Sequence, residues 1–412
     1  MKALIVGSGV AGPATALFLH RLGWDVQVLE ATAAPDAEAG AFLNVASNGQ
    51  AVLAELGLQA HVLTDAHPSP RMVMWSGRGK RLGEVPNGPA GDMTRGSAVV
   101  RRSWLHQVLR EAVLDAGLSI TTRARVVTVR ETPDEIVAVT DDGRKFTADL
   151  VVGADGVGSA VRGYVDPAAP VPSYSGLVGL GGFASGTGLA PTPGTQHFVF
   201  GRRSFFGYLV RDDGTVYWFS NLTHPEVSQA ELRAVPGQEW LTRLRDLHRD
   251  DLHPVPDILA AADNTVGAYA IYDLPVVPRW HRGRAVCIGD AVHATSPSAG
   301  QGASLALEDA QLLAQCLRDF GSVELALDTF HRLRHERAEA VVAYARKISD
   351  QKKISTSRVA MVIRDLMLPL FLRRASSDTT QNWLYDYRVD WNQRLESSSA
   401  GGGEENLTTR GR

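Results

Sequence analysis

The chain has 412 residues, of which 44% are hydrophobic and 21% are charged, a length for about two to three domains with sizeable cores. These fractions exclude a disordered or collagen-like chain. The net charge of −3 gives no global basic excess for nucleic acid or an anionic membrane. Two cysteines, Cys287 and Cys316, are too few for a disulfide framework and lack the spacing of a metal site. We therefore expect a cytoplasmic protein with no metal and no nucleic-acid partner.

The chain opens with the pattern of a strand, a helix and a second strand. Residues 3–7 form a short apolar run that ends in glycine, which is typical of a buried parallel strand. Residues 10–22 carry apolar side chains at helical spacing, and residues 26–29 read as the next strand. Further helices are predicted at 50–58 and 103–116, and further strands at 126–129, 136–140 and 150–152.

The middle of the chain changes character. Residues 172–270 are rich in aromatic side chains, and strands are predicted at 196–200, 205–210 and 216–220. Asp212, Asp213 and Gly214 predict a hairpin turn between the last two strands. We interpret this region as an antiparallel sheet in a second domain.

The final third of the chain is expected to be mostly helical. A buried strand at 285–288 and a helix at 303–319 precede a largely helical segment at 323–373. Arg364, Asp365 and Pro369 interrupt its apolar part, which favours packing against the body over membrane insertion, and no membrane span is expected.

A glycine-rich loop follows the first strand. Gly7, Gly9 and Gly12 form a G-x-G-x-x-G with Val10 and Ala11 between them, and Glu30 ends the next strand. In this βαβ context the glycines permit a tight turn, close approach of a pyrophosphate and close helix packing. The helix N-terminus attracts phosphate, and Glu30 is suited to accept the ribose hydroxyls of an adenosine. The loop thus predicts an adenine dinucleotide without choosing between FAD and NAD.

Two later glycine–acid segments make that choice. One runs from Leu150 through Asp155-Gly156 to Arg162, and the other joins Gly289-Asp290 and His293 to Pro297 and Gly300-Gln301-Gly302-Ala303. With the N-terminal loop they resemble, in order and spacing, the three fingerprints of class A (single-component) FAD-dependent monooxygenases, the aromatic-hydroxylase superfamily. The resemblance covers nearly all of residues 1–330, and Gly40 and Asn48-Gly49 also match it.

The resemblance implies roles for particular residues. Arg102, at the start of an Arg-x-x-Leu-x-x-x-Leu helix, is expected to contact the flavin, with Arg101 as an adjacent competitor. Asp290 is expected at a ribityl hydroxyl, and the helix that begins near Ala303 directs its dipole at the pyrimidine edge of the flavin. The implied cofactor residues are Gly7, Gly9, Val10, Ala11, Gly12, Glu30, Arg102, Val126, Asp155, Asp290, Pro297, Gly300, Gln301, Gly302 and Ala303.

Simpler interpretations remain open at two of these positions and at His293. Asp290 also suits a helix N-cap or a strand-end turn. Asp155 also suits an Asp-Gly turn. His293 is interpreted as a support of its loop rather than as a general base. Ser304 stands where the family usually has Asn, which argues against a side-chain hydrogen bond to the flavin there.

The implied fold is α/β: a Rossmann-like FAD-binding domain, a second antiparallel β-sheet substrate domain, and a C-terminal helical brace. The expected FAD domain comprises residues 1–75, 97–170 and 270–322, and the sheet domain 76–96 and 171–269. The C-terminal helices are expected at 323–396, and a disordered tail at 397–412. The aromatic residues expected to line the substrate pocket are Phe198, Phe200, Phe206, Tyr208 and Trp218, with packing of alternate members into a core as the open alternative for each of them.

The implied activity is NAD(P)H-dependent monooxygenation. FAD takes electrons from NADH or NADPH and inserts one atom of O2, through a flavin C4a-hydroperoxide, into an aromatic or heteroaromatic small molecule, by hydroxylation in secondary metabolism or catabolism. No acid or base is assigned, and the Pro297 and Gly300 loop is expected beside the reactive flavin edge. A monomer or homodimer is expected. Another FAD-dependent reaction on this fold, or a non-catalytic flavin-binding protein, is the alternative; halogenation is disfavoured because no Trp-x-Trp occurs.

Overall fold

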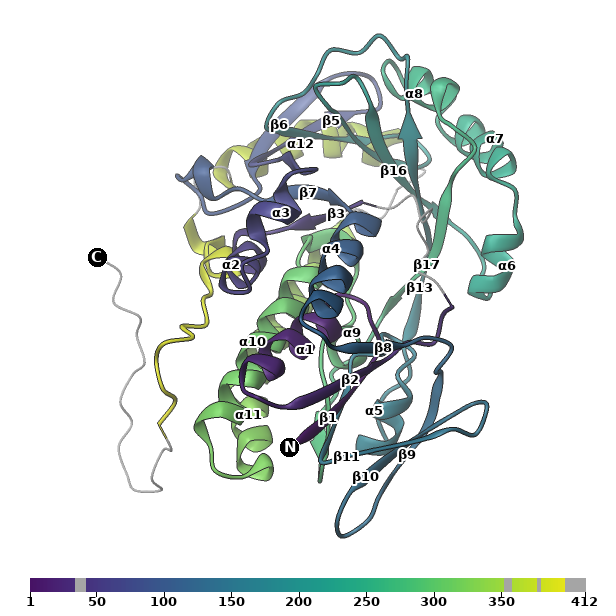
Figure 1. Ribbon diagram of the computed structural model, residues 1–412. Coiled ribbons are helices and arrows are strands. Elements are labelled where there is room, and N and C mark those ends of the chain that lie inside the picture. Colours follow the sequence, from purple (N-terminus) through teal and green to yellow (C-terminus); the bar gives the residue numbers. More distant parts are fainter. Residues whose placement is uncertain (34–41, 352–357, 376–378, 397–412) are drawn as a thin grey trace.

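The computed structural model of the protein describes residues 1–33, 42–351, 358–375 and 379–396. Its elements form two sheet-based layers joined by long helices (Figure 1). The sequence expectations for Gly40 and for the tail from residue 397 lie outside the described residues. The helices are α1 (Ala11–Arg21), α2 (Ser47–Glu55), α3 (Gln59–Leu63), α4 (Arg102–Asp115), α5 (Ala160–Val165), α6 (Gln229–Ala234), α7 (Gly237–Leu247), α8 (Val255–Ala261), α9 (Asp290–His293), α10 (Gly302–Asp319), α11 (Val323–Gln351), α12 (Arg358–Ala375) and α13 (Trp383–Asp386).

A six-stranded sheet forms the first layer. Its order is β18-β19-β12-β1-β2-β8, and all neighbours are parallel except the edge pair β18 and β19. The strands are β1 (Lys2–Val6), β2 (Asp25–Leu29), β8 (Ser119–Thr121), β12 (Leu150–Gly153), β18 (His281–Arg282) and β19 (Ala285–Cys287). Ala3, Leu4 and Ile5 are fully buried, as expected for a central parallel strand covered on both faces.

Helices and a small sheet cover this layer. Helices α1, α10 and α11 lie on one side, and α5 lies on the other with the antiparallel sheet β11-β10-β9 (Figure 1). The three strands are β9 (Val126–Glu131), β10 (Ile136–Thr140) and β11 (Lys145–Ala148). The predicted βαβ opening is therefore confirmed.

A seven-stranded sheet forms the second layer, in the order β17-β13-β16-β15-β14-β5-β6. The strands are β5 (Arg71–Ser76), β6 (Arg81–Pro86), β13 (Ser173–Ala184), β14 (Thr195–Phe200), β15 (Phe205–Val210), β16 (Val216–Thr223) and β17 (Gly267–Asp273). Two expected boundaries need correction. Residues 71–75 belong to this sheet because β5 pairs in parallel with β14, and the sheet continues past residue 269 to the end of β17.

The two faces of this sheet have different neighbours. Alternate side chains of its strands pack with Trp240, Leu241 and Ile258 of α7 and α8, which form a core of their own. The opposite alternation places Phe183, Leu209 and Tyr217 against Phe42 and Val99. Phe42 and Val99 come from a third sheet, β3-β7-β4, whose strands are β3 (Phe42–Val45), β4 (His67–Pro68) and β7 (Ala98–Arg101).

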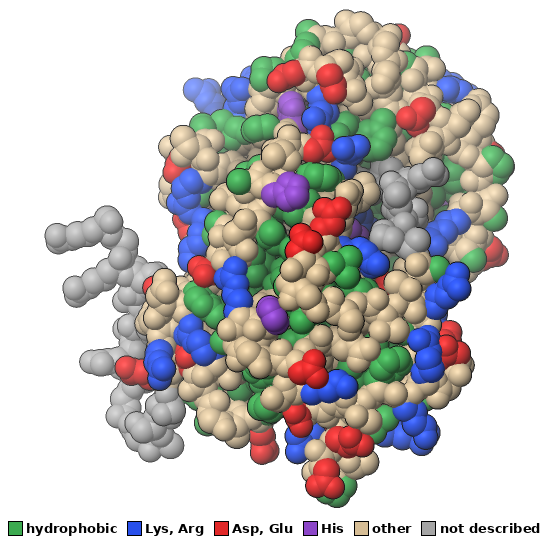
Figure 2. All heavy atoms as spheres, in the orientation of Figure 1, with side chains coloured by type: hydrophobic (Ala, Val, Ile, Leu, Met, Phe, Trp, Pro, Cys, Tyr) green, Lys and Arg blue, Asp and Glu red, His purple; other side chains and the backbone are tan. Residues whose placement is uncertain are grey.

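The C-terminal helices tie the layers together. Helix α11 packs along α10, and α12 crosses the seven-stranded sheet at its edge strand β6 (Figure 1). Acidic and basic side chains are interspersed over the face shown in Figure 2. Among the described residues, no helix combines the length and apolarity needed to cross a bilayer.

Candidate cofactor site

The glycine loop after β1 is built for close approach of backbone groups. Gly7 has φ +104, and a Cβ there would lie 2.3 Å from the Ala154 carbonyl oxygen. A Cβ on Gly12 would lie 2.0 Å from the Gly7 carbonyl oxygen, so both glycines are needed by the fold itself. A Cβ on Gly9 would meet no atom within 4 Å. The open space of the loop is therefore at Gly9, where the N-terminus of α1 begins.

Glu30 lies beside this loop with both carboxylate oxygens engaged. One oxygen accepts hydrogen bonds from the Ser8 amide at 2.9 Å and the Ser8 hydroxyl at 2.8 Å. The other accepts from the amide and hydroxyl of Thr32, both at 2.8 Å. Burial alone would raise the pKa of Glu30, but these four donors hold it below its usual value. Glu30 is thus an ionised acceptor. The hydroxyls of a bound ribose can replace the hydroxyls of Ser8 and Thr32 as its hydrogen-bond donors.

The Asp155 carboxylate is hydrogen-bonded to the start of helix α5. It accepts hydrogen bonds from the Ser159 hydroxyl and from the amides of Ala160 and Val161 at 2.8 and 3.2 Å, at the N-terminus of α5. Burial raises the pKa of Asp155 although these donors oppose it. Gly156 has φ +75, as the Asp-Gly turn interpretation expects, and the contacts of Asp155 with the start of α5 go beyond that interpretation. A role of Asp155 toward a cofactor stays a prediction, supported by its position against Gly7.

The segment from Gly289 to Ala303 crosses the same edge of the six-stranded sheet. Asp290 begins the four-residue helix α9 and is exposed, and its expected contact with a ribityl hydroxyl stays a prediction. Pro297 starts a 3₁₀ turn that ends at Gly300, whose φ of +62 is left-handed. Helix α10 then begins without a side-chain cap, and the buried Gln301 leaves its Nε2 without a hydrogen-bond partner. Unmet donors therefore converge at this turn.

His293 is locked into a buried ion network and is not available as a base. Its Nε2 lies 2.6 Å from a carboxylate oxygen of Asp309, which also accepts the Gly289 amide at 2.7 Å. Burial lowers the pKa of His293, but the charge of Asp309 outweighs it and the pKa is raised. Conversely, burial would raise the pKa of Asp309, yet His293 and Arg334 hold it at about 2. The interpretation of His293 as a loop support agrees with these contacts.

Arg334 carries the network into α11. The fully buried guanidinium binds Asp309 through Nε and Glu308 through Nη1. Glu308 is also bound by Arg337 at 2.8 Å and by the Asn48 amide at 2.6 Å. This network fixes the start of α10, and with it the turn before it. The sequence assigned no role to Glu308, Asp309 or Arg334. Their partners lie 16 to 29 residues away in the chain, and no sequence pattern links residues that far apart.

Arg102 is exposed at the start of α4 and lies between two groups. Burial and the charge of Arg102 lower the pKa of His106 to about 4. Burial raises the pKa of Tyr269 on β17, and the same guanidinium opposes that rise. Arg101 instead pairs with Asp65 at 2.6 Å on the outside. The charge of Arg102 thus acts on both His106 of α4 and Tyr269 of the seven-stranded sheet, whereas Arg101 pairs with Asp65.

The expected substrate-lining aromatics divide between the two faces of the sheet. Phe206, Tyr208 and Trp218 belong to the core formed with α7 and α8, so their expected place in a pocket beside the cofactor is wrong. Strand alternation decides this, since each side chain points opposite to its neighbours. Phe198 and Phe200 are on the other face, but they pack with Met74 and Leu82 near α12.

The face that does turn toward the cofactor loop includes polar residues missed from the sequence. Gln196 Nε2 donates to the Asn44 side-chain oxygen at 2.9 Å. A Cβ on Gly300 would lie 3.1 Å from Asn44 Nδ2, so this amide pair stands next to the turn at Gly300. The side chain of Val126 is buried in the core of the first layer. If Val126 contacts a cofactor, its backbone makes the contact. Among the described residues no cluster is suited to hold a metal ion.

Comparisons with known proteins agree on one kind of protein. A family model described as FAD binding domain matches residues 1–345. The Aurachin C monooxygenase/isomerase of Stigmatella aurantiaca is 29% identical over 387 residues, covering 93% of this chain and 97% of that protein. An FAD-dependent urate hydroxylase of Klebsiella pneumoniae is 30% identical over 363 residues, covering 85% and 90%. A crystal structure of a Klebsiella pneumoniae HpxO variant complexed with FAD matches with a TM-score of 0.82 at 26% identity, over 93% of this chain and 99% of that chain.

Proposed function

The chain belongs to the FAD-binding-domain family of monooxygenases, the class A aromatic-hydroxylase superfamily, and from this premise we propose that it hydroxylates an aromatic or heteroaromatic small molecule with electrons from NADH or NADPH. The single observation that carries the substrate class is the inner face of the seven-stranded sheet. Leu209 and Tyr217 are buried there and pack with the half-buried Phe183, and the Gln196–Asn44 amide pair stands beside the Gly300 turn. Such a face suits a flat ring with a polar substituent.

The residues of the site fit FAD. Gly9 leaves open space for a pyrophosphate at the start of α1, and Glu30 presents an ionised carboxylate for a ribose. The uncapped start of α10 and the unpartnered Nε2 of Gln301 offer donors for carbonyl oxygens of the ring. Bound there, FAD supplies the electron transfer and the oxygen activation that no side chain provides.

The chain's own residues orient the reactants and exclude water. The Asp309–Arg334 network holds the Gly300 turn and the start of α10 in place. Arg102 supplies a positive charge near Tyr269 on β17 of the seven-stranded sheet. Phe42, Phe183 and Tyr217 form an apolar cluster on the same face of the seven-stranded sheet as Gln196, and this cluster would help to exclude water from the reacting groups.

A test is anaerobic reduction of the FAD-loaded protein by NADH and by NADPH, with a panel of phenols and N-heteroaromatics, followed by oxygen. We expect one compound class to speed reduction and to leave with one added oxygen atom. Gln196→Leu should raise the KM for that compound, whereas Gln229→Leu, a change on the outer helix α6, should leave it unchanged. Reduction that no compound accelerates, followed by release of all oxygen as hydrogen peroxide, would contradict the proposal.

Oxidative rearrangement is the second candidate. It is favoured by the similarity of this chain, over 97% of the relative's length, to a protein whose name combines monooxygenase and isomerase. Mass and carbon connectivity of the product separate the two reactions. Simple hydroxylation adds one oxygen and leaves the carbon skeleton intact, whereas rearrangement moves a substituent.

A further inference from the structure

Phe219 of β16 lies between two glycines on the inner face of the seven-stranded sheet. The strand register places Gly181 of β13 on one side of Phe219 and Gly207 of β15 on the other. The inner face is the one that carries Phe183 and Tyr217, and Phe219 shares it because it stands two residues after Tyr217 on the same strand. Neither neighbouring position therefore has a side chain that limits where the Phe219 ring lies.

The ring lies on the Gly207 side. A Cβ on Gly207 would be 2.1 Å from Cε1 and 2.5 Å from Cζ of Phe219, so the ring occupies the place of the missing side chain. Three aromatic rings surround it there, with centroid distances of 5.8 Å to Phe42, 5.9 Å to Phe198 and 5.9 Å to Phe205. Any displacement of the ring is therefore directed the other way, across β16 toward β13.

On that side the row of side chains is empty for two strands. Gly181 pairs with Gly267 of the edge strand β17, and we call these two residues the glycine strip. Because strands lie about 4.8 Å apart, the strip extends the bare backbone about 10 Å from β16 to β17. Phe183 stands two residues beyond the strip on β13. At the other end the Tyr269 ring takes the place of a Cβ on Gly179, which would lie 2.6 Å from its Cε2.

Phe219 and the glycine strip are connected to the surroundings of the candidate cofactor turn. Phe42 contacts the Phe219 ring and stands two residues before Asn44 on β3. Asn44 lies next to the turn at Gly300 and accepts a hydrogen bond from the Gln196 side chain. Phe219 is half-buried, so the protein does not cover its ring completely. An apolar ring and an amide pair thus border the same region.

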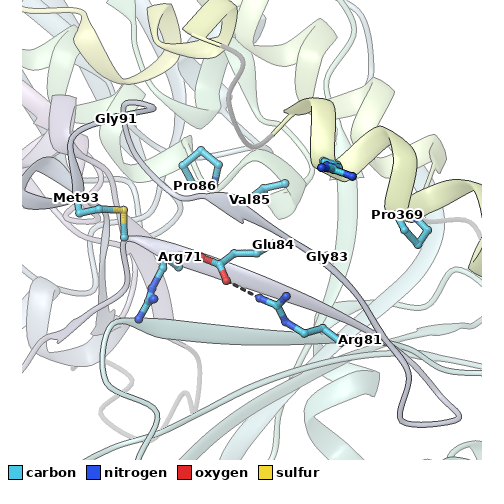
Figure 3. A pocket seen from close by; sticks show the side chains of 10 residues that line it. Arg71, Arg81, Gly83, Glu84, Val85, Pro86, Gly91, Met93 and Pro369 are labelled. Atoms are coloured by element: carbon cyan, nitrogen blue, oxygen red, sulfur yellow. Dashed lines mark hydrogen bonds and ion pairs between the residues drawn. The ribbon is translucent and has the colours of Figure 1, made fainter.

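A cleft at the opposite edge of the sheet has a different character. It lies between β6 and α12, has a volume of about 460 Å³, and is lined by charged and aliphatic side chains without an aromatic ring (Figure 3). Arg81 and Glu84 form an ion pair of 2.6 Å within it. A flat apolar compound is suited to the aromatic surroundings of Phe219 rather than to this cleft.

On the basis of the proposed function, we propose that Phe219 is a specificity-determining residue and that Gly207 sets its position. With the ring on Gly207, the glycine strip stays free for a flat compound longer than a single ring. The site then selects fused two-ring aromatic or heteroaromatic compounds over single-ring ones. The Phe219 ring contacts the end of the compound, and the Gln196–Asn44 pair binds its polar substituent.

Binding to the oxidised, FAD-loaded protein tests the proposal without turnover. The probes are 2-naphthol and 6-hydroxyquinoline with two rings, and phenol and 3-hydroxypyridine with one, titrated against the flavin absorbance. Wild type should bind the two-ring probes more tightly. Gly207→Ala should displace the Phe219 ring over the glycine strip, and so weaken the two-ring probes about tenfold or more and the single-ring probes less than about threefold. Only the far end of the Phe219 side chain meets the new methyl group, so this variant should fold.

A second substitution shows whether the effect passes through Phe219. Leucine at position 219 does not need the space over Gly207, so Gly207→Ala with Phe219→Leu should bind the two-ring probes as Phe219→Leu alone does. The matched controls are Gly321→Ala, whose Cβ would meet nothing within 4 Å, and Phe206→Leu on the other face of the sheet. Both should keep the wild-type ratio of the two affinities, and all variants should keep their FAD content.

The outcomes separate this proposal from the function on which it rests. Tighter binding of the single-ring probes by wild type would overturn the proposal and leave the proposed function standing, as would an unchanged ratio in Gly207→Ala. The proposal is also overturned if the double variant is as impaired as Gly207→Ala, or if a crystal structure of Gly207→Ala shows the Phe219 ring unmoved. Wild type that binds none of the four probes would contradict the proposed function itself, and the proposal with it.

Discussion

Replacement of Gly9 by alanine separates the needs of the fold from the needs of the cofactor. A Cβ at Gly9 meets no atom within 4 Å, whereas a Cβ at Gly12 would lie 2.0 Å from a backbone oxygen. Gly9→Ala should therefore leave the free energy of unfolding of the FAD-free protein unchanged or raised by about 0.4–1 kcal/mol, through the smaller entropy of the unfolded chain. Its methyl group nevertheless fills the space that a pyrophosphate needs, so FAD should bind at least about tenfold more weakly, ~1.4 kcal/mol.

Gly12→Ala is the comparison. It forces the backbone apart and should cost about 1–3 kcal/mol or more of unfolding free energy even without FAD. Urea unfolding of the FAD-free proteins and fluorescence titration with FAD measure the two effects independently. The reasoning is refuted if Gly9→Ala binds FAD as tightly as wild type, or if it loses as much stability as Gly12→Ala.

Four further substitutions test other parts of the structure. Trp218→Ala should cost about 3–5 kcal/mol of stability with little change in KM, because Trp218 faces α7, whereas Phe183→Leu should change KM more than stability. Arg334→Met should cost about 3–5 kcal/mol, since it leaves Asp309 and Glu308 buried without their shared cation. His106 has its pKa lowered to about 4, so its contribution to stability is complete above about pH 6.5 and is lost as the pH falls through 4. His106→Gln should flatten the thermal stability of the protein over that window.

Arg334→Met and His106→Gln each have a control at an exposed site. Arg249→Met breaks a surface pair with Asp246 and should cost at most about 1 kcal/mol in urea unfolding. His20→Gln, at an exposed position of α1, should leave the pH profile of the melting temperature as it is in wild type. Equal losses for Arg334→Met and Arg249→Met would contradict the buried-network account. An unaltered profile for His106→Gln would show that this histidine does not titrate as its surroundings imply.

The sequence was sufficient to predict the features that depend only on residues close to one another in the chain. The G-x-G-x-x-G loop, the strand before it and the helix after it are local, and they recur as β1 and α1. The Gly-Asp and Gly-Gln-Gly segments are equally local, because a left-handed glycine and a proline turn restrict the backbone directly. The family assignment rested on these segments and is confirmed.

The sequence could not show which face of the second sheet meets the cofactor. Phe198 and Trp218 have equally aromatic surroundings along the chain, and only strand pairing and the position of α7 place them on opposite faces. The Asn44–Gln196 pair joins residues 152 apart, and β5 enters the second sheet through a parallel pairing with β14. Such contacts leave no periodic trace in either segment.

The sequence thus determined the local motifs and their reactive groups. The tertiary structure determined which residues pair with those groups. The sequence established a dinucleotide loop, an acid at the end of the second strand and a largely helical C-terminal region. Only the folded chain decided that Asp309 would be held by His293 and Arg334, and that α12 would bury one apolar face while exposing the other. The physical reason is that burial and charge pairing depend on distance in space, which a sequence pattern constrains only over a few residues.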